Sequence, residues 1–316
     1  MKLELSRRGR VLLALALVVS SASLTTGCGG DGGGGSGGAV GATTGTISGT
    51  ATKGPVSGAT MTAYAISNGV KGGQLGSAMT SSNGNFTITM GAYSGPVMLQ
   101  LHGGSFTDEA TGKHVNMLDA DDMTCVIPFV TVTAGSMMNG IQVTPLTSMA
   151  HAWAQHMNGG MTATNIGDAN ARVGAAYVGP GADILMTHPI DPAVAGSANG
   201  ASVESKNYGM VLGAMSQEAL GLGMATSSSG MSTAMTNDAS DGIMDGMMMG
   251  APIGMNGMGG MMGGGNMMAT AGTSQLATAM STFVANPMNV SGVTTVAEMQ
   301  TLMNQLNQLA TSGGHL

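Results

Sequence analysis

The sequence has few charged side chains, few aromatic side chains and few cysteines. Charged residues make up 8% of the 316 positions and aromatic residues 3%, whereas about 25% of the residues of an average protein are charged. Only 9 residues are Lys or Arg, against 16 Asp and Glu. A chain so poor in basic residues has no positive surface for a phosphate backbone, so we exclude nucleic acid as a partner.

Glycine and methionine, in contrast, are abundant, with 54 and 32 copies. Methionine is flexible and fills irregular gaps, so we expect an interior built on pliable packing and glycine turns. The two cysteines are Cys28 and Cys125. Cys125 lies in a strand-like apolar run, which predicts a small buried hydrophobic residue rather than a reactive thiol.

The first 27 residues have the order of an export signal. Lys2, Arg7, Arg8 and Arg10 precede the apolar run Val11 to Val19, which is too short for a bilayer core that needs about 20 residues. Without this segment, the 9 Lys and Arg become 5 and the 16 Asp and Glu become 15, a net charge of −10.

Leu24-Thr25-Thr26-Gly27-Cys28 resembles the cleavage and lipidation signal of bacterial lipoproteins. This resemblance implies a signal peptide over 1–27, an acylated Cys28, and a flexible glycine-rich tether over 28–44. The partners would be the lipid bilayer and the lipoprotein processing and sorting machinery. Gly29, in place of the Asp that retains such proteins in the inner membrane, favours the outer membrane of the cell envelope. Two alternatives stay open: an ordinary signal cut near Ser21 to Ser23, and twin-arginine export.

Short β-prone runs alternate with turn residues over 45–144, which predicts an all-β sandwich. Ser82-Asn83-Gly84-Asn85 predicts a hairpin, because Asn-Gly suits a tight I′ turn. The acidic residues of one long segment, together with His114, predict a solvated surface: Asp108, Glu109, Asp119, Asp121 and Asp122. The expected strands are Thr46–Thr52, Ala59–Ile66, Gly76–Thr80, Asn85–Met90, Val97–His102, Cys125–Thr133 and Gly140–Val143.

Two motifs in this half resemble the carboxypeptidase regulatory-like, transthyretin-like β-sandwich of bacterial envelope proteins. They are Gly54-Pro55-Val56-Ser57-Gly58-Ala59, which follows Gly49, and Asn83-Gly84-Asn85-Phe86, which follows Thr80. The resemblance implies a non-catalytic scaffold or binding module over these residues.

The period of the apolar pattern changes at Thr144-Pro145, where Thr is expected as N-cap and Pro as first helical residue. We therefore expect a helical domain over 145–316, crossed by a long connection over Gly179–Asn199, and an α+β multidomain chain whose second part is an all-α bundle. Thr295 and Glu298 predict a capping box.

The segment Val143-Thr144-Pro145-Leu146-Thr147 resembles uncharacterised bacterial lipoproteins, and this resemblance implies no activity. Helices are expected from 145 and over 162–178, 202–224, 231–249, 273–285 and 296–310.

Two groups of side chains in the helical half are candidates for metal binding. Asp238, Asp241 and Asp245 are spaced to share one helix face, which fits either a divalent cation or an exposed acidic face. Thioethers are soft ligands for Cu(I), and a Met/Gly-rich loop over 244–268 contains M-x-x-M pairs drawn from Met244, Met247, Met255, Met258 and Met261. The alternative is that this loop only reflects the methionine content of the whole chain.

The sequence contains no P-loop, no H-E-x-x-H, no zinc-binding cysteine pair and no S-x-x-K. We therefore predict a lipid-anchored envelope lipoprotein that is not an enzyme, has no assigned cofactor and has a structural or ligand- or partner-binding role, with the protein or small-molecule partner unspecified. The alternative prediction is periplasmic Cu(I) binding or oxidant buffering through the Met-rich loop.

Overall fold

Strands form the first half of the folded chain because their apolar residues alternate with polar ones. The computed structural model describes residues 44–224, 228–248, 250–253 and 271–316. In strand β4, for example, Phe86, Ile88 and Met90 are buried and the residues between them are exposed. The strands of this half are β1 (Thr44–Ala51), β2 (Thr60–Ser67), β3 (Val70–Met79), β4 (Asn85–Gly91), β5 (Tyr93–His102), β6 (Ser105–Thr107), β7 (His114–Asn116), β8 (Met123–Val132) and β9 (Met137–Val143).

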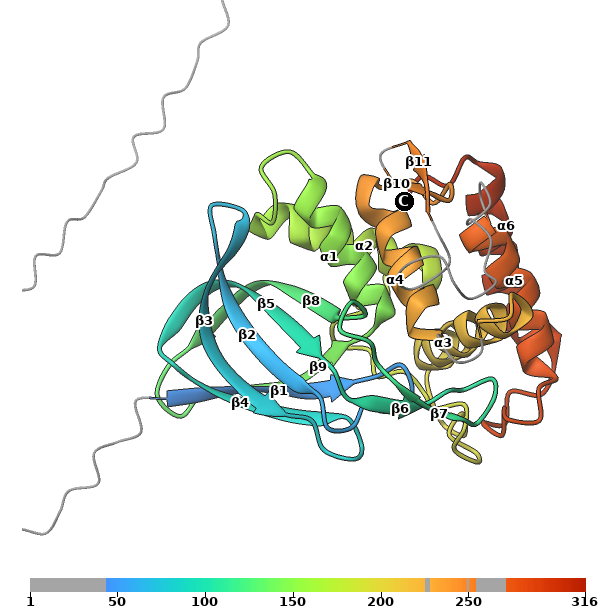
Figure 1. The fold of residues 1–316 in the computed structure, drawn as a ribbon, viewed down its shortest axis with the longest axis horizontal. Helices are drawn as coiled ribbons and strands as arrows, with labels where there is room; N and C mark the ends of the chain where they lie inside the picture. Colours follow the sequence, from blue (N-terminus) through green and yellow to red (C-terminus); the bar gives the residue numbers. More distant parts are fainter. Residues whose placement is uncertain (1–43, 225–227, 249, 254–270) are drawn as a thin grey trace, which may run out of the picture. The chain divides into compact units, whose positions relative to one another are not determined.

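Seven of these strands form two sheets that face each other (Figure 1). One sheet has the order β3-β2-β5-β8 and is antiparallel throughout; the other has the order β4-β1-β9, with β1 and β9 parallel. β6 and β7 pair separately. Buried side chains from both sheets, including Ile47, Ile88 and Leu99, form a shared apolar interior between them.

The hairpin predicted at residues 82–85 is wrong, because β3 and β4 belong to different sheets. The tight turn itself is present: Gly84 has φ +73° and its N–H donates to the Ser81 carbonyl at 2.9 Å. β4 contributes a buried face that pairs with β1, whereas β3 is exposed along most of its length. The turn therefore carries the chain from one sheet to the other.

The helices begin where the sequence predicts, at Thr144. The Thr144 hydroxyl accepts from the Thr147 N–H at 3.3 Å, and the Thr147 hydroxyl accepts from the Thr144 N–H at 2.9 Å. This reciprocal capping box spans Pro145, which occupies the first helical position. The helices are α1 (Pro145–His156), α2 (Ala163–Tyr177), α3 (Val203–Gly221), α4 (Ser228–Asp238), α5 (Ala271–Val284) and α6 (Val296–Thr311).

Two helix predictions need correction. The helix expected over 231–249 is α4, which ends at Asp238; a 3-10 turn η1 (Ala239–Asp241), then Gly242 at φ +83°, stop it before the short strands β10 (Met247–Met248) and β11 (Ala251–Pro252). At α6, the Thr295 side chain makes no capping bond within the described chain. The Glu298 carboxylate instead accepts from the Thr294 N–H at 3.1 Å.

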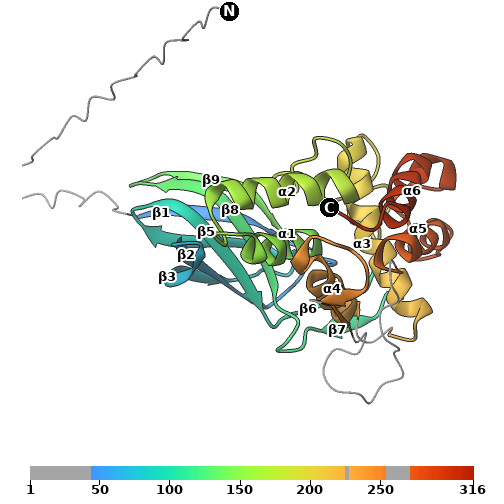
Figure 2. The same cartoon turned by 90° about the horizontal axis from the view of Figure 1, so that it is seen from above.

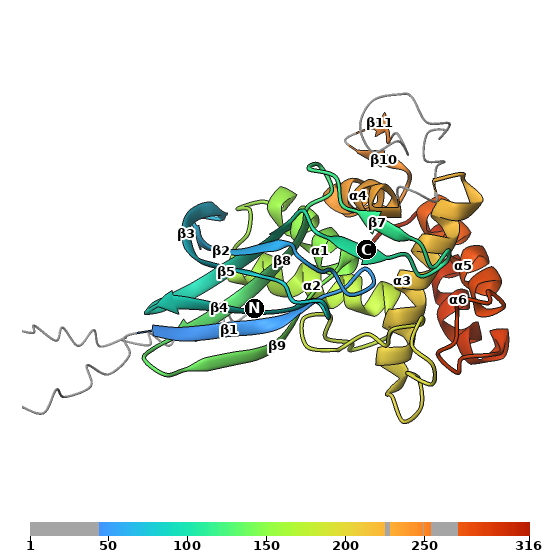
Figure 3. The same ribbon diagram turned by 60° about the horizontal axis from the view of Figure 1, so that its bottom comes forward.

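The helices pack against the sheets. α1 and α2 cover the outer face of the four-stranded sheet at β8 (Figure 2), and α5 and α6 lie beyond α3 on the side away from the sheets (Figure 3). A second apolar interior runs from Ile66, Met98 and Val126 of the sheet into all of these helices. The described residues from Thr44 onward thus belong to one compact unit of the α+β class. None of the described helices is long and apolar enough to cross a membrane.

Candidate functional site

A buried ion pair lies where the sheets meet helix α3. Lys53 follows β1, and Glu109 follows β6. Lys53 Nζ lies 2.8 Å from Glu109 Oε2, and both side chains are 1% exposed. The adjacent Gly54 has φ +60°, and a Cβ there would lie 2.4 Å from the Thr107 carbonyl oxygen. Glycine is therefore required at position 54 for the Lys53 turn to approach β6.

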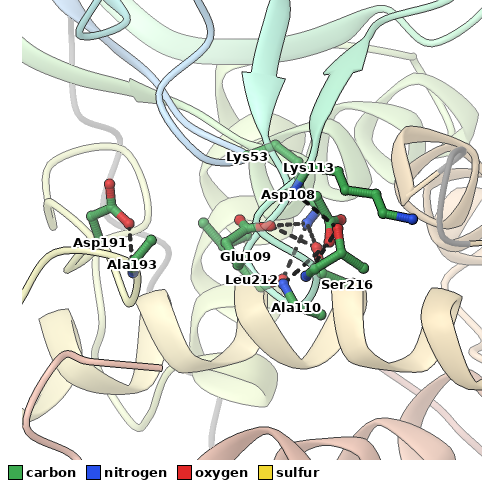
Figure 4. A network of polar contacts seen from close by, with 10 residues as sticks. Lys53, Asp108, Glu109, Ala110, Lys113, Asp191, Ala193, Leu212 and Ser216 are labelled. Carbon is green, nitrogen blue, oxygen red and sulfur yellow. Dashed lines mark hydrogen bonds and ion pairs between the residues drawn. The ribbon is translucent and has the colours of Figure 1, made fainter. Parts of the chain in front are cut away.

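The ammonium group of Lys53 also bonds to helix α3. Nζ donates to the Ser216 hydroxyl at 2.5 Å and to the Leu212 carbonyl at 3.2 Å, and the Ser216 hydroxyl in turn donates to Glu109 Oε2 at 2.6 Å. Figure 4 shows Lys53 extending toward α3 with Glu109 and Ser216 on either side of its amino group. All three donors of the ammonium are used, so the network ties the strand half of the fold to α3.

Asp108 is the second buried carboxylate of this network. Its Oδ1 accepts from the Thr111 N–H at 2.9 Å and from the Thr111 hydroxyl at 2.7 Å, which closes the loop before β7. Burial alone would raise the pKa of Asp108, but the charge of Lys53 and the hydroxyls of Ser228, Thr111 and Ser216 outweigh it and lower the pKa. Asp108 is therefore ionised at neutral pH, beside a cation that is shared with Glu109.

A third carboxylate, Asp121, connects the strands to helix α4. It accepts from the Ser229 hydroxyl at 2.5 Å and from the Thr233 hydroxyl at 2.9 Å. A cavity of about 10 Å³ lies between this group and Lys53, which is room for a single water molecule. The space between Lys53 and Asp121 therefore has no room for a larger molecule.

The predicted solvated acidic surface is wrong for these three carboxylates, since Asp108, Glu109 and Asp121 are at most 2% exposed. Their partners Ser216, Ser229 and Thr233 lie more than 100 residues further along the chain. The other two acidic residues of the segment do lie near solvent: His102 contacts Asp122 at 2.7 Å and Asp119 at 3.8 Å. The hydrogen bond and charge of Asp122 raise the pKa of His102.

Lysine beside serine is also an arrangement that enzymes use to activate a hydroxyl nucleophile. Such a lysine must be a neutral base, and the serine must be reachable by a substrate. Here Lys53 is paired with a carboxylate, and the Ser216 hydroxyl donates to Glu109 from a side chain that is only 1% exposed. This geometry fits a structural contact between the strand half and α3 rather than an activated nucleophile.

The aspartates predicted to share a helix face do not share one. Asp238 ends α4, Asp241 lies in η1, and Asp245 follows the turn. Each accepts from a nearby backbone N–H: Gly246 at 2.7 Å, Ile243 at 3.1 Å and Met247 at 2.9 Å, respectively. Among the described residues, no group of three or more His, Cys, Asp or Glu side chains could hold a metal ion.

Some of the other predicted site residues lie within the described chain, and some lie outside it. Met244 is fully buried in the helical interior, and Met247 is half-buried in β10. Cys28, Met255, Met258 and Met261 lie outside the described residues. Cys125 is fully buried as predicted, and burial followed by the charge of Asp183 raises the pKa of its thiol.

Sequence reasoning did not predict the burial of a second set of ionisable groups, in the helical half. Within the described chain, neither carboxylate oxygen of Glu218 on α3 has a hydrogen-bond partner, nor does Asp238 Oδ2 or the Tyr177 hydroxyl. Burial raises the pKa of Glu218 to about 8 and that of Asp238 to about 7. Burial and then the charges of Asp238 and Glu218 raise the pKa of Tyr177. Only the apolar neighbours of Glu218, Met215 and Ala219, hint at its burial in the sequence.

His151 and His156 are five residues apart and so do not form the i, i+4 pair of a helical metal site. The sequence therefore predicts that both are surface residues, and this prediction is wrong for His151. His156 is exposed, but His151 is half-buried, with its Nδ1 2.9 Å from the Thr124 hydroxyl. Burial, followed by the charges of Lys71 and His156, lowers the pKa of His151 to about 4. It is therefore a neutral packing residue at pH 7.

Comparisons with known proteins assign no family. A scan against protein-family models finds no match, and a search of curated proteins also finds none. Among solved structures, a 9R-lipoxygenase from Cyanothece PCC8801 aligns with 12% identity and a TM-score of 0.19, over 32% of this chain and 16% of the lipoxygenase. A likeness this low carries no argument about fold or activity.

Proposed function

We propose that this chain is a lipid-anchored lipoprotein of the cell envelope whose folded part has a non-catalytic, structural or binding role. The observation that carries the non-catalytic part is the Lys53 network, in which the ammonium of Lys53 and the hydroxyl of Ser216 both bond to Glu109 in the buried interior. The anchoring part rests on the basic and apolar N-terminal segment, the Leu24–Cys28 motif and Gly29, which favours the outer membrane.

The proposal includes a finer description of the chain. A glycine-rich tether over 28–44 links the acylated Cys28 to a carboxypeptidase regulatory-like sandwich over 45–144, and a helical domain over 145–316 follows. The first described strand begins at Thr44, directly after the glycine-rich segment, which is consistent with this order. The lipid bilayer and the processing and sorting machinery are the proposed partners.

Radiolabelled palmitate tests the anchor in cells that express wild type and Cys28→Ser. Label on the wild type that disappears in the variant is expected. Cys125→Ser is the matched control and should keep the label, because that thiol is buried in the fold. An unlabelled wild-type protein, or label retained in Cys28→Ser, would show that the anchor is wrongly assigned.

The alternative proposal is Cu(I) binding or oxidant buffering through the Met-rich loop. Support comes from the repeated M-x-x-M spacing and from Met247 and Met248 of β10, which are half-buried and exposed. A competition titration should compare the full chain with a variant that lacks residues 254–268 and carries Met247→Leu and Met248→Leu, which leaves the buried Met244 in place. Loss of Cu(I) stoichiometry on deletion supports this alternative, and an unchanged stoichiometry rules it out.

A further inference from the structure

One end of the sandwich brings the start of β1 together with two turns (Figure 1). Thr44, the first residue of β1, pairs with Gly91, where β4 ends, and Met137, where β9 begins, pairs two residues further along β1. On the other sheet, β5 begins and β8 ends at the pair of Tyr93 and Val132. Thr44, Met137 and the turns over 91–93 and 133–136 therefore form one surface, which we call the strand-end surface.

The strand-end surface carries no charge. It lies wholly within segments 44–52, 85–101 and 123–150, which contain no Asp, Glu, Lys, Arg or His. Its exposed residues include Ala92 and Ala134 in the two turns, and Met137, which is 72% exposed. The chain after residue 27 has 15 Asp and Glu against 5 Lys and Arg, so all of this acidic excess is placed elsewhere.

The strand-end surface is also where the chain enters the fold. Thr44 follows Cys28, the anchored residue of the proposed function, by sixteen positions, and a glycine-rich flexible chain of that length spans about 20–24 Å on average. The strands extend past α1 and α2 toward Thr44, whereas α5 and α6 lie beyond α3 at the opposite end (Figure 2). An anchor at Cys28 therefore holds the strand-end surface nearest to the bilayer.

We propose that the strand-end surface rests on the headgroup region of the anchoring bilayer and that the helical half points away from it. Anionic lipids repel acidic protein surfaces, and this end has no charge to repel. Exposed apolar side chains such as Met137 can enter the interface. A weak contact is sufficient, because the anchor keeps the local concentration of the bilayer high. The inference rests on the lipid anchor proposed above and adds the orientation of the anchored fold.

A fluorophore at position 137 tests this orientation. The chain from residue 28 onward, with Cys28→Ser and an N-terminal hexahistidine tag, is bound to phosphatidylcholine and phosphatidylglycerol vesicles through a nickel-chelating lipid. This chain contains the whole compact unit to which the described residues belong. Met137→Cys supplies the accessible thiol for a nitrobenzoxadiazole label, because Cys125 is fully buried. On vesicles, the emission should shift to the blue and be quenched by lipids with a spin label near the headgroup.

Met79→Cys is the matched control, since Met79 is also an exposed methionine, at 62%. It ends β3 and pairs with Thr60, which in turn pairs with His102 at the end of β5 remote from Tyr93. A label at this position should give the same emission with and without vesicles.

A second pair of variants tests the absence of charge. Ala134→Glu adds a negative charge to the turn after β8, whereas Ser82→Glu adds one to the exposed turn before β4, at the other end of β1. With the label at position 137, Ala134→Glu should weaken the contact about fivefold on anionic vesicles, because each charge near such a surface contributes about that factor. Ser82→Glu should leave the contact unchanged.

Four results would overturn the proposal: no vesicle-dependent change at position 137, equal quenching at positions 79 and 137, an undiminished contact in Ala134→Glu, or a change that appears only at high surface density of protein. The last result would indicate contact with a second copy instead of lipid. The tag supplies an anchor whether or not Cys28 is acylated in cells, so failure of the orientation and failure of the palmitate test can be told apart.

Discussion

The interior between the two sheets and the interior among the helices are built from different side chains. The first contains β-branched and leucine residues such as Ile47, Ile88 and Leu99, and its members are all apolar. The second is rich in methionine and alanine, and it surrounds Tyr177, Glu218 and Asp238, which carry buried oxygens without a partner in the described chain. Branched side chains have few rotamers, whereas methionine adapts to irregular space. The helical interior is thus able to adapt around Glu218 and Asp238, whereas the unpaired oxygens of the strand half that belong to Asp108 and Glu109 are accompanied by the charge of Lys53.

This difference predicts that stability is set differently in the two regions. A purely apolar interior is insensitive to pH, whereas a carboxyl group buried without a partner must stay protonated or weaken the fold. The Lys53 network lies between the two, because it joins the strand half to α3 through paired charges. Substitutions in the network, in the helical interior and at the helix caps should therefore have effects of decreasing size.

The largest effect is expected from Lys53→Met, which leaves Glu109 and Asp108 buried without their cation. Breaking a buried pair by removing one partner costs about 3–5 kcal/mol of unfolding free energy. Lys113→Met, in the same loop region but exposed, should change it by less than about 0.5 kcal/mol. Urea unfolding followed by circular dichroism measures both. Equal, small effects of the two substitutions would mean that the network does not hold the two regions together.

The second prediction concerns Glu218 and pH. Its folded pKa of about 8 lies above the ordinary value for glutamate, so the folded state keeps a proton that the unfolded state releases. Unfolding free energy should therefore fall as pH rises from about 4.5 to about 8. Glu218→Gln removes this loss, and we expect a gain of about 2–4 kcal/mol at pH 8 but no difference at pH 4, because a tenfold change in proton affinity corresponds to about 1.4 kcal/mol.

Two other carboxylates, Asp238 and Glu204, serve as comparisons for the pH dependence measured with Glu218→Gln. With Glu218 replaced, Asp238 should still give a falling stability up to about pH 7, where its own raised pKa lies, so the slope should level off between pH 7 and 8. Glu204 is on the same helix but only half-buried, and backbone and Ser202 hydrogen bonds lower its pKa. It is ionised throughout the range, so Glu204→Gln should keep the wild-type slope; a slope unchanged in Glu218→Gln would contradict the assignment.

Most strands of the first half can be predicted from the local alternation of apolar and polar residues. The expected strands over 46–52, 59–66, 85–90 and 97–102 are present as β1, β2, β4 and β5 within a few residues, because alternating burial leaves a period of two in the sequence. β6 and β7 could not be predicted in this way, because each has three residues and is too short to show a period of two. The pairing of β4 with β1 rather than β3 escapes it too, because a turn motif specifies a turn and not the sheet that follows it.

The burial of charged residues could not be predicted, because it depends on partners far away in the chain. The sequence around Asp121 is typical of a polar loop. Its burial is favourable only because Ser229 and Thr233 on α4 donate hydrogen bonds to its carboxylate. The length of α4 is overestimated from the sequence for a related reason. The methionines after Asp238 continue a helical spacing, but Asp238, Asp241 and Asp245 bond to nearby backbone N–H groups in turns, which competes with a helix.

The smallest effect is predicted for two threonines at equivalent cap positions, one beside the sheets and one remote from them. Thr144 is fully buried; its hydroxyl accepts from the Thr147 N–H and lies 2.6 Å from the Tyr208 hydroxyl. Thr144→Ala should therefore cost about 1–2 kcal/mol of unfolding free energy. Thr295 is exposed and its side chain caps nothing in the described chain, so Thr295→Ala should stay within about 0.5 kcal/mol. Equal losses in urea unfolding would mean that the cap of α1 is no more important to the fold than that of α6, although α1 packs on the sheet.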